Sequence, residues 1–191
     1  MKIIFATHNI KKVEELKKLF PSKYKVLSLN DIGCNCEIEE TGSTLEENAQ
    51  IKADYVRYKY GLDCFSDDSG LEIDALKGAP GVNSARYAGP ERNNDANIKK
   101  IWNELKGNFK SKACFRSVFF IHFKGKKYII QGKVDGNIIN EKRGSDGFGY
   151  DPIFIPKNYD RTFAELGDRI KNKISHRALA TFQLLKLFKD S

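Results

Sequence analysis

Residues 65–70 read Phe-Ser-Asp-Asp-Ser-Gly and place two adjacent carboxylates and a hydroxyl after an apolar run that begins at Leu62. Two neighbouring acids at the end of a buried strand are costly to remove from water unless a cation or a reacting group needs them. Mg²⁺ is usually held by one or two carboxylates together with substrate phosphates. A polar turn is the alternative, because Asp, Ser and Gly are common turn residues.

A second candidate lies at residues 7–12, Thr-His-Asn-Ile-Lys-Lys, between a predicted strand and a predicted helix. A helix N-terminus offers backbone N–H groups and a partial positive charge, so it is a ready anion site. Thr7 and Asn9 can donate hydrogen bonds there, and Lys12 can reach a phosphate held at the helix start. Simple capping by Thr7 or Asn9, with the lysines in solvent, is the alternative.

The third candidate is Glu-Glu-Thr-Gly at residues 39–42. If Glu39 folds beside Asp67 and Asp68, three carboxylates converge, and their like charges require a metal ion. Lys52, on the helix that follows, can point back at the same anion. A solvated loop is the alternative reading of these four residues.

Residues 147–152, Gly-Phe-Gly-Tyr-Asp-Pro, partly match the RNP1 pattern of RNA-binding sheets. The match fails because Asp146 holds the basic position and Pro152 would break a central strand. We expect instead a tight loop in which Phe148 stacks on a single base and Asp151 accepts a hydrogen bond. A purely structural Gly/Pro turn remains open.

The last candidate is Ile-Ser-His-Arg at residues 174–177, preceded by Lys171, at the start of the final predicted helix. Donors gathered at a helix N-terminus suit the recognition of carbonyl oxygens or phosphates. The alternative is a Ser N-cap with His176 and Arg177 exposed. The adjacent Ser and His are no catalytic triad, because triad partners must meet in space with an orienting acid.

The elements that would position these residues alternate between strand and helix in the first half of the chain and include a β-hairpin in the second half. This pattern predicts an α/β fold, with a mixed sheet flanked by helices and a cleft between two parts of one domain. The predicted strands are 2–6, 24–29, 62–65, 71–76, 114–123 and 128–139, and the predicted helices are 9–20, 44–60, 95–105 and 175–188.

Composition indicates a water-soluble protein with an anionic ligand. The chain of 191 residues has a formal net charge of +8, which nucleic acid or a nucleotide phosphate tail would satisfy equally well. Its basic residues are spread along the chain, without the compact basic tail of a nucleic-acid arm. No apolar run approaches the ~20 residues of a membrane span. The four cysteines lack zinc-site spacing, so we expect reduced thiols and a cytoplasmic protein.

Taken together, the motifs resemble the inosine triphosphate pyrophosphatase (ITPase) family, from Ala6 to the last helix. They are, in chain order, A-T-H-N-x-x-K, E-E-T-G, E-N-A-x-x-K-A, D-D-S-G, G-A-P-G-V-x-S-A-R-Y-A-G, G-F-G-Y-D-P-I-F and I-S-H-R. The resemblance implies an elongated, two-lobed α/β fold with a nucleotide-binding cleft between the lobes, and a homodimer. It also implies Mg²⁺-dependent hydrolysis of ITP, dITP and XTP to a nucleoside monophosphate and pyrophosphate.

The resemblance also implies roles for individual residues. Asp68 would accept the proton of the attacking water. Glu39 and Asp68 would organise Mg²⁺, with Asp67 in support. The substrate-binding residues would be Thr7, His8, Asn9, Ile10, Lys11, Lys12 and Lys52 for the triphosphate, Ser69 beside them, and Phe148, Gly149, Tyr150, Asp151, Lys171, His176 and Arg177 for the base. His8 departs from the family, which often has glycine at this position.

Three other functions stay open on the sequence. A nucleic-acid-binding module would not need Asp68 and would bind oligonucleotides in a salt-sensitive way. A Maf-like nucleotide pyrophosphatase would run the same phosphate chemistry on other bases. A catalytically inactive homologue is disfavoured because Lys12, Glu39, Asp68 and Lys171 are all present.

Overall fold

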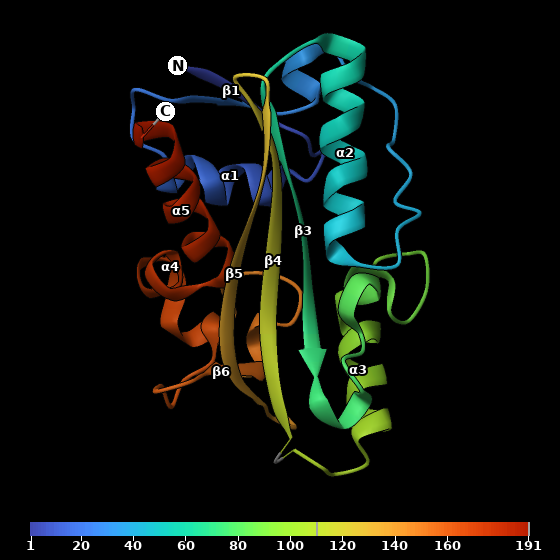
Figure 1. The fold of residues 1–191 in the computed structure, drawn as a ribbon. Coiled ribbons are helices and arrows are strands. Elements are labelled where there is room, and N and C mark those ends of the chain that lie inside the picture. The colour runs from blue at the N-terminus through green and yellow to red at the C-terminus, as the bar shows by residue number, and fades with distance from the viewer. Residues whose placement is uncertain (110, 191) are drawn as a thin grey trace. The chain divides into compact units, whose positions relative to one another are not determined.

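The computed structural model describes residues 1–109 and 111–190 and contains, within these residues, a six-stranded sheet in the order β2-β1-β3-β4-β5-β6 (Figure 1). Strand β1 pairs in parallel with β2 and β3, whereas β5 pairs antiparallel with β6, so the sheet is mixed. The α/β class predicted from the sequence is therefore confirmed. The strands are β1 (Lys2–Phe5), β2 (Lys25–Leu27), β3 (Cys64–Ile73), β4 (Lys112–Phe123), β5 (Lys126–Ile138) and β6 (Phe154–Pro156).

The helices are α1 (Ile10–Leu19), α2 (Leu45–Tyr60), α3 (Asn94–Leu105), α4 (Phe163–Ile174) and α5 (His176–Asp190). Their ends follow the capping residues that the sequence offers. The Asn9 side chain accepts the Lys12 N–H at the start of α1, and Thr44 forms a reciprocal capping box with Glu47 at the start of α2. Gly61 ends α2 with a φ of 65°, which favours glycine. None of the described helices is long and apolar enough to span a bilayer.

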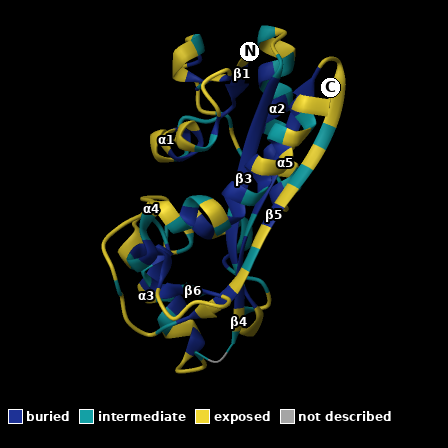
Figure 2. Cartoon of the chain, turned by 90° about the vertical axis from the view of Figure 1, so that its left-hand side faces the viewer, coloured by how far each residue is buried: buried dark blue, intermediate teal, exposed yellow. Residues whose placement is uncertain are grey.

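The chain divides into two compact units. Unit 1 consists of Met1–Asp68, Ser117–Gly132 and the chain from Arg177, and unit 2 consists of Ser69–Arg116 and Lys133–His176. The long strands β3, β4 and β5 each contribute one segment to each unit. Strand β3 is buried along nearly its whole length, whereas in β5 exposed positions alternate with partly or fully buried ones (Figure 2).

Unit 1 has an aromatic core that fixes the start of β3. Phe5 and Phe65 stack with ring centroids 4.7 Å apart, and Phe119 packs against Phe65 at 5.6 Å. Leu16 of α1 and Leu184 of α5 are fully buried in the same cluster. Each side chain of this size contributes roughly 1.5–3 kcal/mol on burial, so the strand that carries the paired acids is firmly held.

Unit 2 has its own core, which fixes the loop around Phe148. Phe154 packs against Phe115 at 4.7 Å and against Phe163 of α4 at 5.4 Å. The Tyr150 hydroxyl donates to the Ser84 carbonyl oxygen (2.7 Å), which ties the loop to the 3₁₀ segment Gly81–Arg86.

Two expectations about the elements were wrong. The paired acids do not end a strand, because β3 continues through them to Ile73, and of the strand predicted at 71–76 only its first half belongs to β3 while Asp74–Leu76 form a 3₁₀ turn. Gly70 permits this continuation, since a Cβ there would lie 2.4 Å from the Gly81 carbonyl oxygen. Helix α4 was not predicted, although Thr162 and Glu165 form a second capping box and the helix is interrupted at Gly167.

Candidate active site

Residues 7–12, which were predicted to bind phosphate and are called the phosphate loop below, connect β1 to the first turn of α1 in unit 1. The Asn9 N–H donates to Thr7 Oγ1 (3.1 Å), and Asn9 Oδ1 accepts the Lys12 N–H (3.2 Å). The His8 side chain ties this loop to the segment around Cys36, because its Nε2–H donates to the Cys36 carbonyl oxygen (3.0 Å). Asn9, Ile10 and Lys11 are exposed, so the first turn of α1 faces solvent and is open to an anion.

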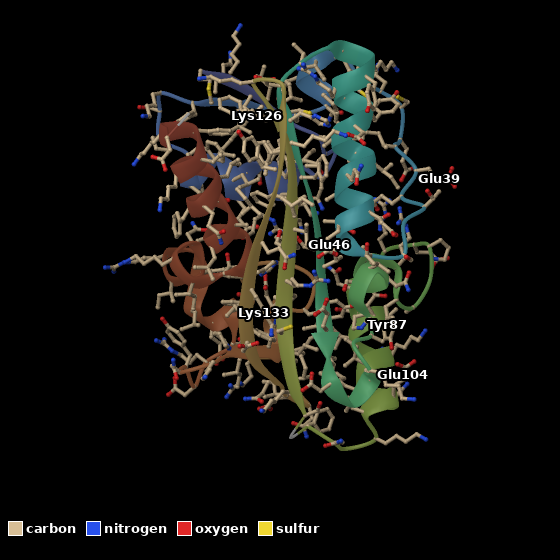
Figure 3. All side chains as sticks on the ribbon, in the orientation of Figure 1. Glu39, Glu46, Tyr87, Glu104, Lys126 and Lys133 are labelled. Carbon is tan, nitrogen blue, oxygen red and sulfur yellow. The ribbon has the colours of Figure 1, made fainter. Side chains whose placement is uncertain are left out.

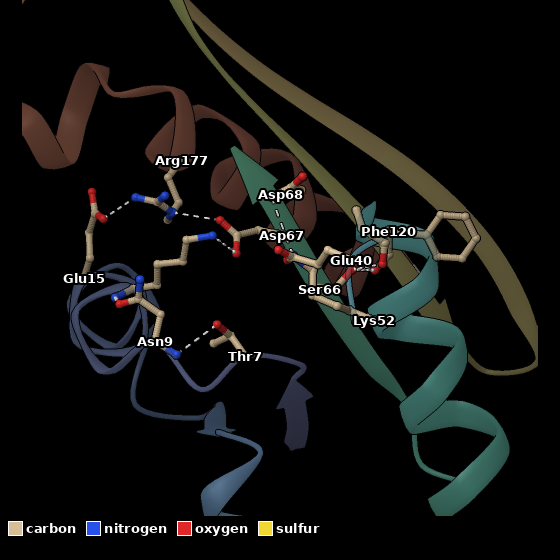
Figure 4. A network of polar contacts seen from close by, with 12 residues as sticks. Thr7, Asn9, Glu15, Glu40, Lys52, Ser66, Asp67, Asp68, Phe120 and Arg177 are labelled. Carbon is tan, nitrogen blue, oxygen red and sulfur yellow. Dashed lines mark hydrogen bonds and ion pairs between the residues drawn. The ribbon is translucent and has the colours of Figure 1, made fainter. Parts of the chain in front are cut away.

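Asp67 lies at the centre of a buried ion-pair network (Figure 4). Its Oδ1 accepts from Lys12 Nζ at 2.8 Å, and its Oδ2 accepts from Arg177 Nε at 3.2 Å. Arg177 also donates to Glu15 Oε2 at 2.5 Å. Arg177 was predicted to bind the base, but the structure places it beside Asp67 in unit 1. Asp67 was predicted to support the metal ion, but both of its oxygens already accept from Lys12 and Arg177.

These pairs keep Asp67 ionised in spite of its burial. Loss of water alone would raise the pKa of the Asp67 carboxyl, but Lys12 and Arg177 outweigh that effect and hold the pKa well below its usual range. Burial likewise disfavours the Arg177 cation, and Glu15 and Asp67 reverse this so that its pKa is raised. Asp67 thus positions Lys12 and Arg177 and remains a charged acceptor.

Asp68 points to the other face of the sheet because successive side chains of a strand alternate. Its Oδ1 lies 3.6 Å from Lys52 Nζ, and Lys52 also donates to Glu40 Oε1. Ser66, which shares this face, donates to the Ala49 carbonyl oxygen of α2 (2.5 Å) and so fixes the helix that carries Lys52.

The electrostatics of Asp68 and Asp67 differ. Burial is the main cause that raises the pKa of the Asp68 carboxyl, and the nearby Glu40 and Asp67 carboxylates raise it further against the opposing effect of Lys52. Burial alone would lower the pKa of Lys52, but Asp68 and Glu40 raise it instead. Asp68 is buried but, unlike Asp67, not completely shielded, and it has a raised affinity for a proton, as a general base needs.

Glu40, not Glu39, reaches this group. Glu39 is exposed and projects from the outer side of its loop, whereas Glu40 is partly buried and contacts Lys52 (Figures 3 and 4). The end of the loop is fixed by the Gly42 N–H, which donates to Asn48 Oδ1 of α2 (2.8 Å). The structure thus places Glu40, and not Glu39, beside Lys52 and Asp68, so the position predicted for Glu39 is wrong.

The carboxylates around Lys52 suit a divalent cation that is bound together with the phosphates of a substrate. We name this group the charged cluster; its members are Lys12, Glu15, Glu40, Lys52, Asp67, Asp68 and Arg177. Its carboxylates outnumber its cations by one, so an incoming polyphosphate needs a further positive charge. Within the described residues no three His, Cys, Asp or Glu side chains are grouped to hold a metal by themselves. Two carboxylates completed by substrate phosphates are the usual magnesium arrangement, and Glu40 with Asp68 fits it.

The residues expected at the base lie mostly in unit 2, where they form a second group. Lys171 Nζ donates to Asp151 Oδ2 at 2.8 Å and lies 4.6 Å from the centroid of the Phe148 ring. The same carboxylate oxygen accepts the Phe148 N–H at 2.8 Å. Lys171 and Asp151 are almost completely buried, whereas Phe148 is partly exposed. The group therefore presents one aromatic ring that is supported from below by a buried ion pair.

Tyr150 and His176, which were also predicted to bind the base, pack inside unit 2. Tyr150 is buried, and burial raises the pKa of its phenol. The His176 ring stacks on Phe115 with centroids 4.9 Å apart. Gly149 and Ser69 are partly exposed, and Ser69 follows Asp68 directly along β3.

Three residues that form or support these sites were not predicted individually from the sequence. Glu15 carried no motif signal, because it lies among the charged residues of an amphipathic helix and only the fold shows that it is buried. Glu40 was named only as part of its motif. Ser84 lies in the S-A-R-Y-A-G motif, where its Oγ accepts the Leu71 N–H (2.9 Å) and so fixes the second half of β3.

Comparison with known proteins agrees with the family suggested by the motifs. A model of the Ham1 family matches residues 3–187. This chain belongs to the Ham1 family. Among the curated relatives, the dITP/XTP pyrophosphatase of Christiangramia forsetii is 52% identical over 186 residues, which cover 97% of this chain and 98% of that protein. The dITP/XTP pyrophosphatase of Bacillus subtilis is 50% identical over 188 residues, 96% of this chain and 95% of the relative.

Solved structures of the family share the fold. A HAM1 protein from Coxiella burnetii superimposes with a TM-score of 0.91 at 38% identity, with both chains covered completely. The nucleoside-triphosphatase, or dITP/XTP pyrophosphatase, of Mycobacterium abscessus gives a TM-score of 0.77 at 38% identity, covering 97% of this chain and 99% of that one.

Proposed function

We propose that this protein hydrolyses the non-canonical purine nucleoside triphosphates dITP, XTP and ITP to the nucleoside monophosphate and pyrophosphate, and so removes them from the nucleotide pool. The observation that carries the proposal is Asp68, which lies between a buried ion-pair network and the Lys52–Glu40 pair and has a raised pKa. Membership of the Ham1 family and the names of the relatives agree with this reading.

The reaction needs charge neutralisation and an aligned water more than a covalent nucleophile. The water oxygen bonds to the α-phosphorus, the bond from that phosphorus to the α–β bridging oxygen breaks, and pyrophosphate leaves with the bond electrons. Asp68, which lies 3.6 Å from the phosphate-binding Lys52, takes the proton of the water. Lys12, Lys52 and the first turn of α1 stabilise the phosphate charge.

Glu40 and Asp68 are the residues that would hold Mg²⁺. When bound, the ion would supply the positive charge that the charged cluster lacks for a polyphosphate. Asp67 stays paired with Lys12 and Arg177, and its part is to hold Lys12 in place.

We propose that unit 2 recognises the base. Phe148 offers a partly exposed ring for stacking on a purine, on the support of Asp151 and Lys171. Hypoxanthine and xanthine present a 6-keto acceptor where adenine presents an amino donor, so a donor such as Lys171, which lies beside the Phe148 ring, would leave adenine mismatched.

The location, the assembly and the partners are part of the same proposal. We propose a cytoplasmic homodimer whose partner is the nucleotide substrate, without a membrane or a nucleic acid. A nucleic-acid module, the main rival, would leave the buried pairs of the charged cluster without a function.

The test is pyrophosphate release from dITP, XTP, ITP, GTP and ATP with Mg²⁺, for the wild type, Asp68→Asn and Asp74→Asn. Asp74 is exposed and makes the matched control. We expect release from dITP, XTP and ITP only, unchanged in Asp74→Asn and reduced by a factor of about 10²–10⁴ in Asp68→Asn, the usual effect of losing a general base. No release from any nucleotide would refute the proposal, and release from other bases would favour a Maf-like preference.

A further inference from the structure

Two cysteines of the loop before Glu40 lie close together in unit 1. Cys34 Sγ and Cys36 Sγ are 3.6 Å apart, and both are free thiols in the structure. Residues two apart along the chain have Cα atoms at most about 7 Å from each other, which is near the upper limit for a disulfide. Cys34 is buried, whereas Cys36 is exposed at a bend of the backbone. An accessible thiol therefore has a protected thiol as its immediate neighbour.

Two side chains of α2 surround the exposed sulfur. Tyr55 Oη lies 2.6 Å from Cys36 Sγ, and Lys59 Nζ donates to Tyr55 Oη at 2.7 Å and lies 3.7 Å from the sulfur itself. The hydrogen bonds from Tyr55 and Cys34 and the Lys59 ammonium lower the pKa of the Cys36 thiol. A thiolate next to a cation and exposed to solvent is the reactive form of cysteine.

The other two cysteines provide a contrast within the same chain. Burial raises the pKa of Cys64 to about 12 and that of Cys114 to about 11. Within residues 1–109 and 111–190 neither sulfur has a lysine as a hydrogen-bond partner, and Cys114 lies 3.6 Å from the Glu72 carboxylate, which opposes a thiolate. They are inert structural thiols and serve as internal references.

We propose that Cys36 is a peroxide-reactive cysteine, that Cys34 is its resolving partner, and that Tyr55 and Lys59 activate it. In the first step the Cys36 thiolate attacks one oxygen of hydrogen peroxide. An S–O bond forms, the O–O bond breaks, and hydroxide leaves and combines with the proton that the Cys36 thiol released to solvent when it ionised, which gives the first water. In the second step the Cys34 sulfur attacks the Cys36 sulfenic sulfur, the S–O bond breaks, and the Cys34 proton leaves with hydroxide as water. Overall two thiols are oxidised to one disulfide, and one peroxide is reduced to two waters.

The disulfide would act on the phosphate loop, a consequence that rests on the proposed function. The two sulfurs must approach from 3.6 Å to about 2.05 Å, which moves the backbone at Cys36. The Cys36 carbonyl oxygen is the acceptor of His8, and Glu40 follows four residues later in the same loop. Oxidation thus displaces a support of the phosphate loop and weakens triphosphate binding.

The reactivity is tested by alkylation with iodoacetamide at pH 7, read by peptide mass spectrometry. In Cys34→Ser, where Cys36 is the remaining thiol of its loop, we expect folded protein to be labelled at Cys36 at least about fivefold faster than urea-unfolded protein. Adding Lys59→Met should remove this difference, while Cys64 and Cys114 stay unlabelled in the folded protein. Equal labelling rates in folded and unfolded chains, or no effect of Lys59→Met, would overturn the proposal.

The oxidation is tested by treating the reduced wild type with hydrogen peroxide. We expect the Cys34–Cys36 peptide to lose two hydrogen atoms and to regain them with dithiothreitol, and Cys34→Ser to yield a sulfenic acid that dimedone traps at Cys36. Sulfinic or sulfonic acid at Cys36 with Cys34 still reduced would contradict the pairing.

The effect on function is read as KM for dITP, which should rise at least about fivefold on oxidation in the wild type and stay constant in Cys34→Ser. An unchanged KM in the oxidised wild type would overturn the coupling to the phosphate loop. Absence of hydrolysis in the reduced wild type would instead refute the proposed function, while the thiol chemistry is decided by the mass spectra alone.

Discussion

Asp67 and Asp68 are neighbours in the chain, but the pleat of β3 gives them opposite tasks. Asp67 is fully buried and both its oxygens accept from cations, so it orders Lys12 and Arg177. Asp68 retains some exposure and a raised pKa, so it can exchange a proton. The sequence predicted that acids at this position carry the chemistry. It could not separate their roles, because that depends on which face of the strand each one occupies.

Glu39 and Glu40 are a second pair of adjacent acids, and which of them binds the metal ion can be tested. Replacing Glu40 by Gln removes a charged metal ligand worth about 1.5–3 kcal/mol, so we expect the Mg²⁺ concentration for half-maximal dITP hydrolysis to rise about tenfold or more. The matched variant Glu39→Gln alters an exposed side chain and should stay within about twofold of the wild type. A large shift in Glu39→Gln and none in Glu40→Gln would return the metal role to Glu39.

Asp67 predicts a dependence of stability on pH. Its pKa is lower in the folded than in the unfolded chain, so its stabilisation is complete above the unfolded value of about 3.9 and is lost as pH falls through the folded value. Asp67→Asn removes the carboxylate from the buried Arg177 and the partly buried Lys12 and should lower the free energy of unfolding at pH 7 by about 3–5 kcal/mol.

Urea unfolding of the wild type and Asp67→Asn between pH 3 and pH 7 measures this difference. It should be constant from pH 7 to about pH 5 and shrink below about pH 4. The exposed Asp74→Asn variant should differ little from the wild type throughout. A gap that stays constant down to pH 3 would show that the Asp67 carboxylate is not the stabilising group.

At the scale of elements, capping residues were the most reliable guide and chemistry-rich segments the least. Asn9, Thr44 and Gly61 correctly bounded α1 and α2. The D-D-S-G segment suggested a turn, because local propensity disregards the ion pairs that make buried acids tolerable in a strand. Helix α4 escaped notice for a related reason, since Gly167 interrupts its apolar pattern although its capping box is the same device that revealed α2.

The loop that carries Phe148 gives an element-scale prediction. Gly147 has a φ of 79°, and a Cβ there would lie 2.2 Å from Asp151 Oδ2, the oxygen that Lys171 and the Phe148 N–H share. Gly147→Ala should therefore break a buried pair and lower stability by about 3–5 kcal/mol, with a raised KM for dITP.

Gly125→Ala, in the β4–β5 turn, is the matched control for Gly147→Ala. Gly125 has a similar φ of 75° but open space around it, so its cost is the backbone strain alone, about 1–2 kcal/mol, with KM unchanged. Measured free energies of unfolding that are equal for the two variants would mean that the Asp151–Lys171 pair does not fix the loop.

At the scale of the whole molecule, the net charge of +8 and the charge of the site have opposite signs. The positive residues are distributed along the chain, whereas the charged cluster holds one more carboxylate than cations. Composition alone therefore predicted an anionic partner but could not tell a nucleotide from a nucleic acid. Two lobes were expected, but the residues at which the chain divides into two units carried no sequence signal, because three long strands run through both units and no linker marks a boundary.

The excess of carboxylates predicts how ligand binding stabilises the molecule. A non-hydrolysable dITP analogue with Mg²⁺, at 100 times its dissociation constant, should raise the free energy of unfolding by about 2.7 kcal/mol. With EDTA in place of Mg²⁺ the same nucleotide concentration should give little stabilisation, because the triphosphate then meets Glu40 and Asp68 without a compensating cation. Calorimetric unfolding scans with the dITP analogue, the matching ATP analogue and a single-stranded oligonucleotide separate the alternatives. Stabilisation by the oligonucleotide, or equal stabilisation by the dITP analogue with and without Mg²⁺, would contradict a metal-dependent nucleotide site and favour a surface that binds phosphate by net charge alone.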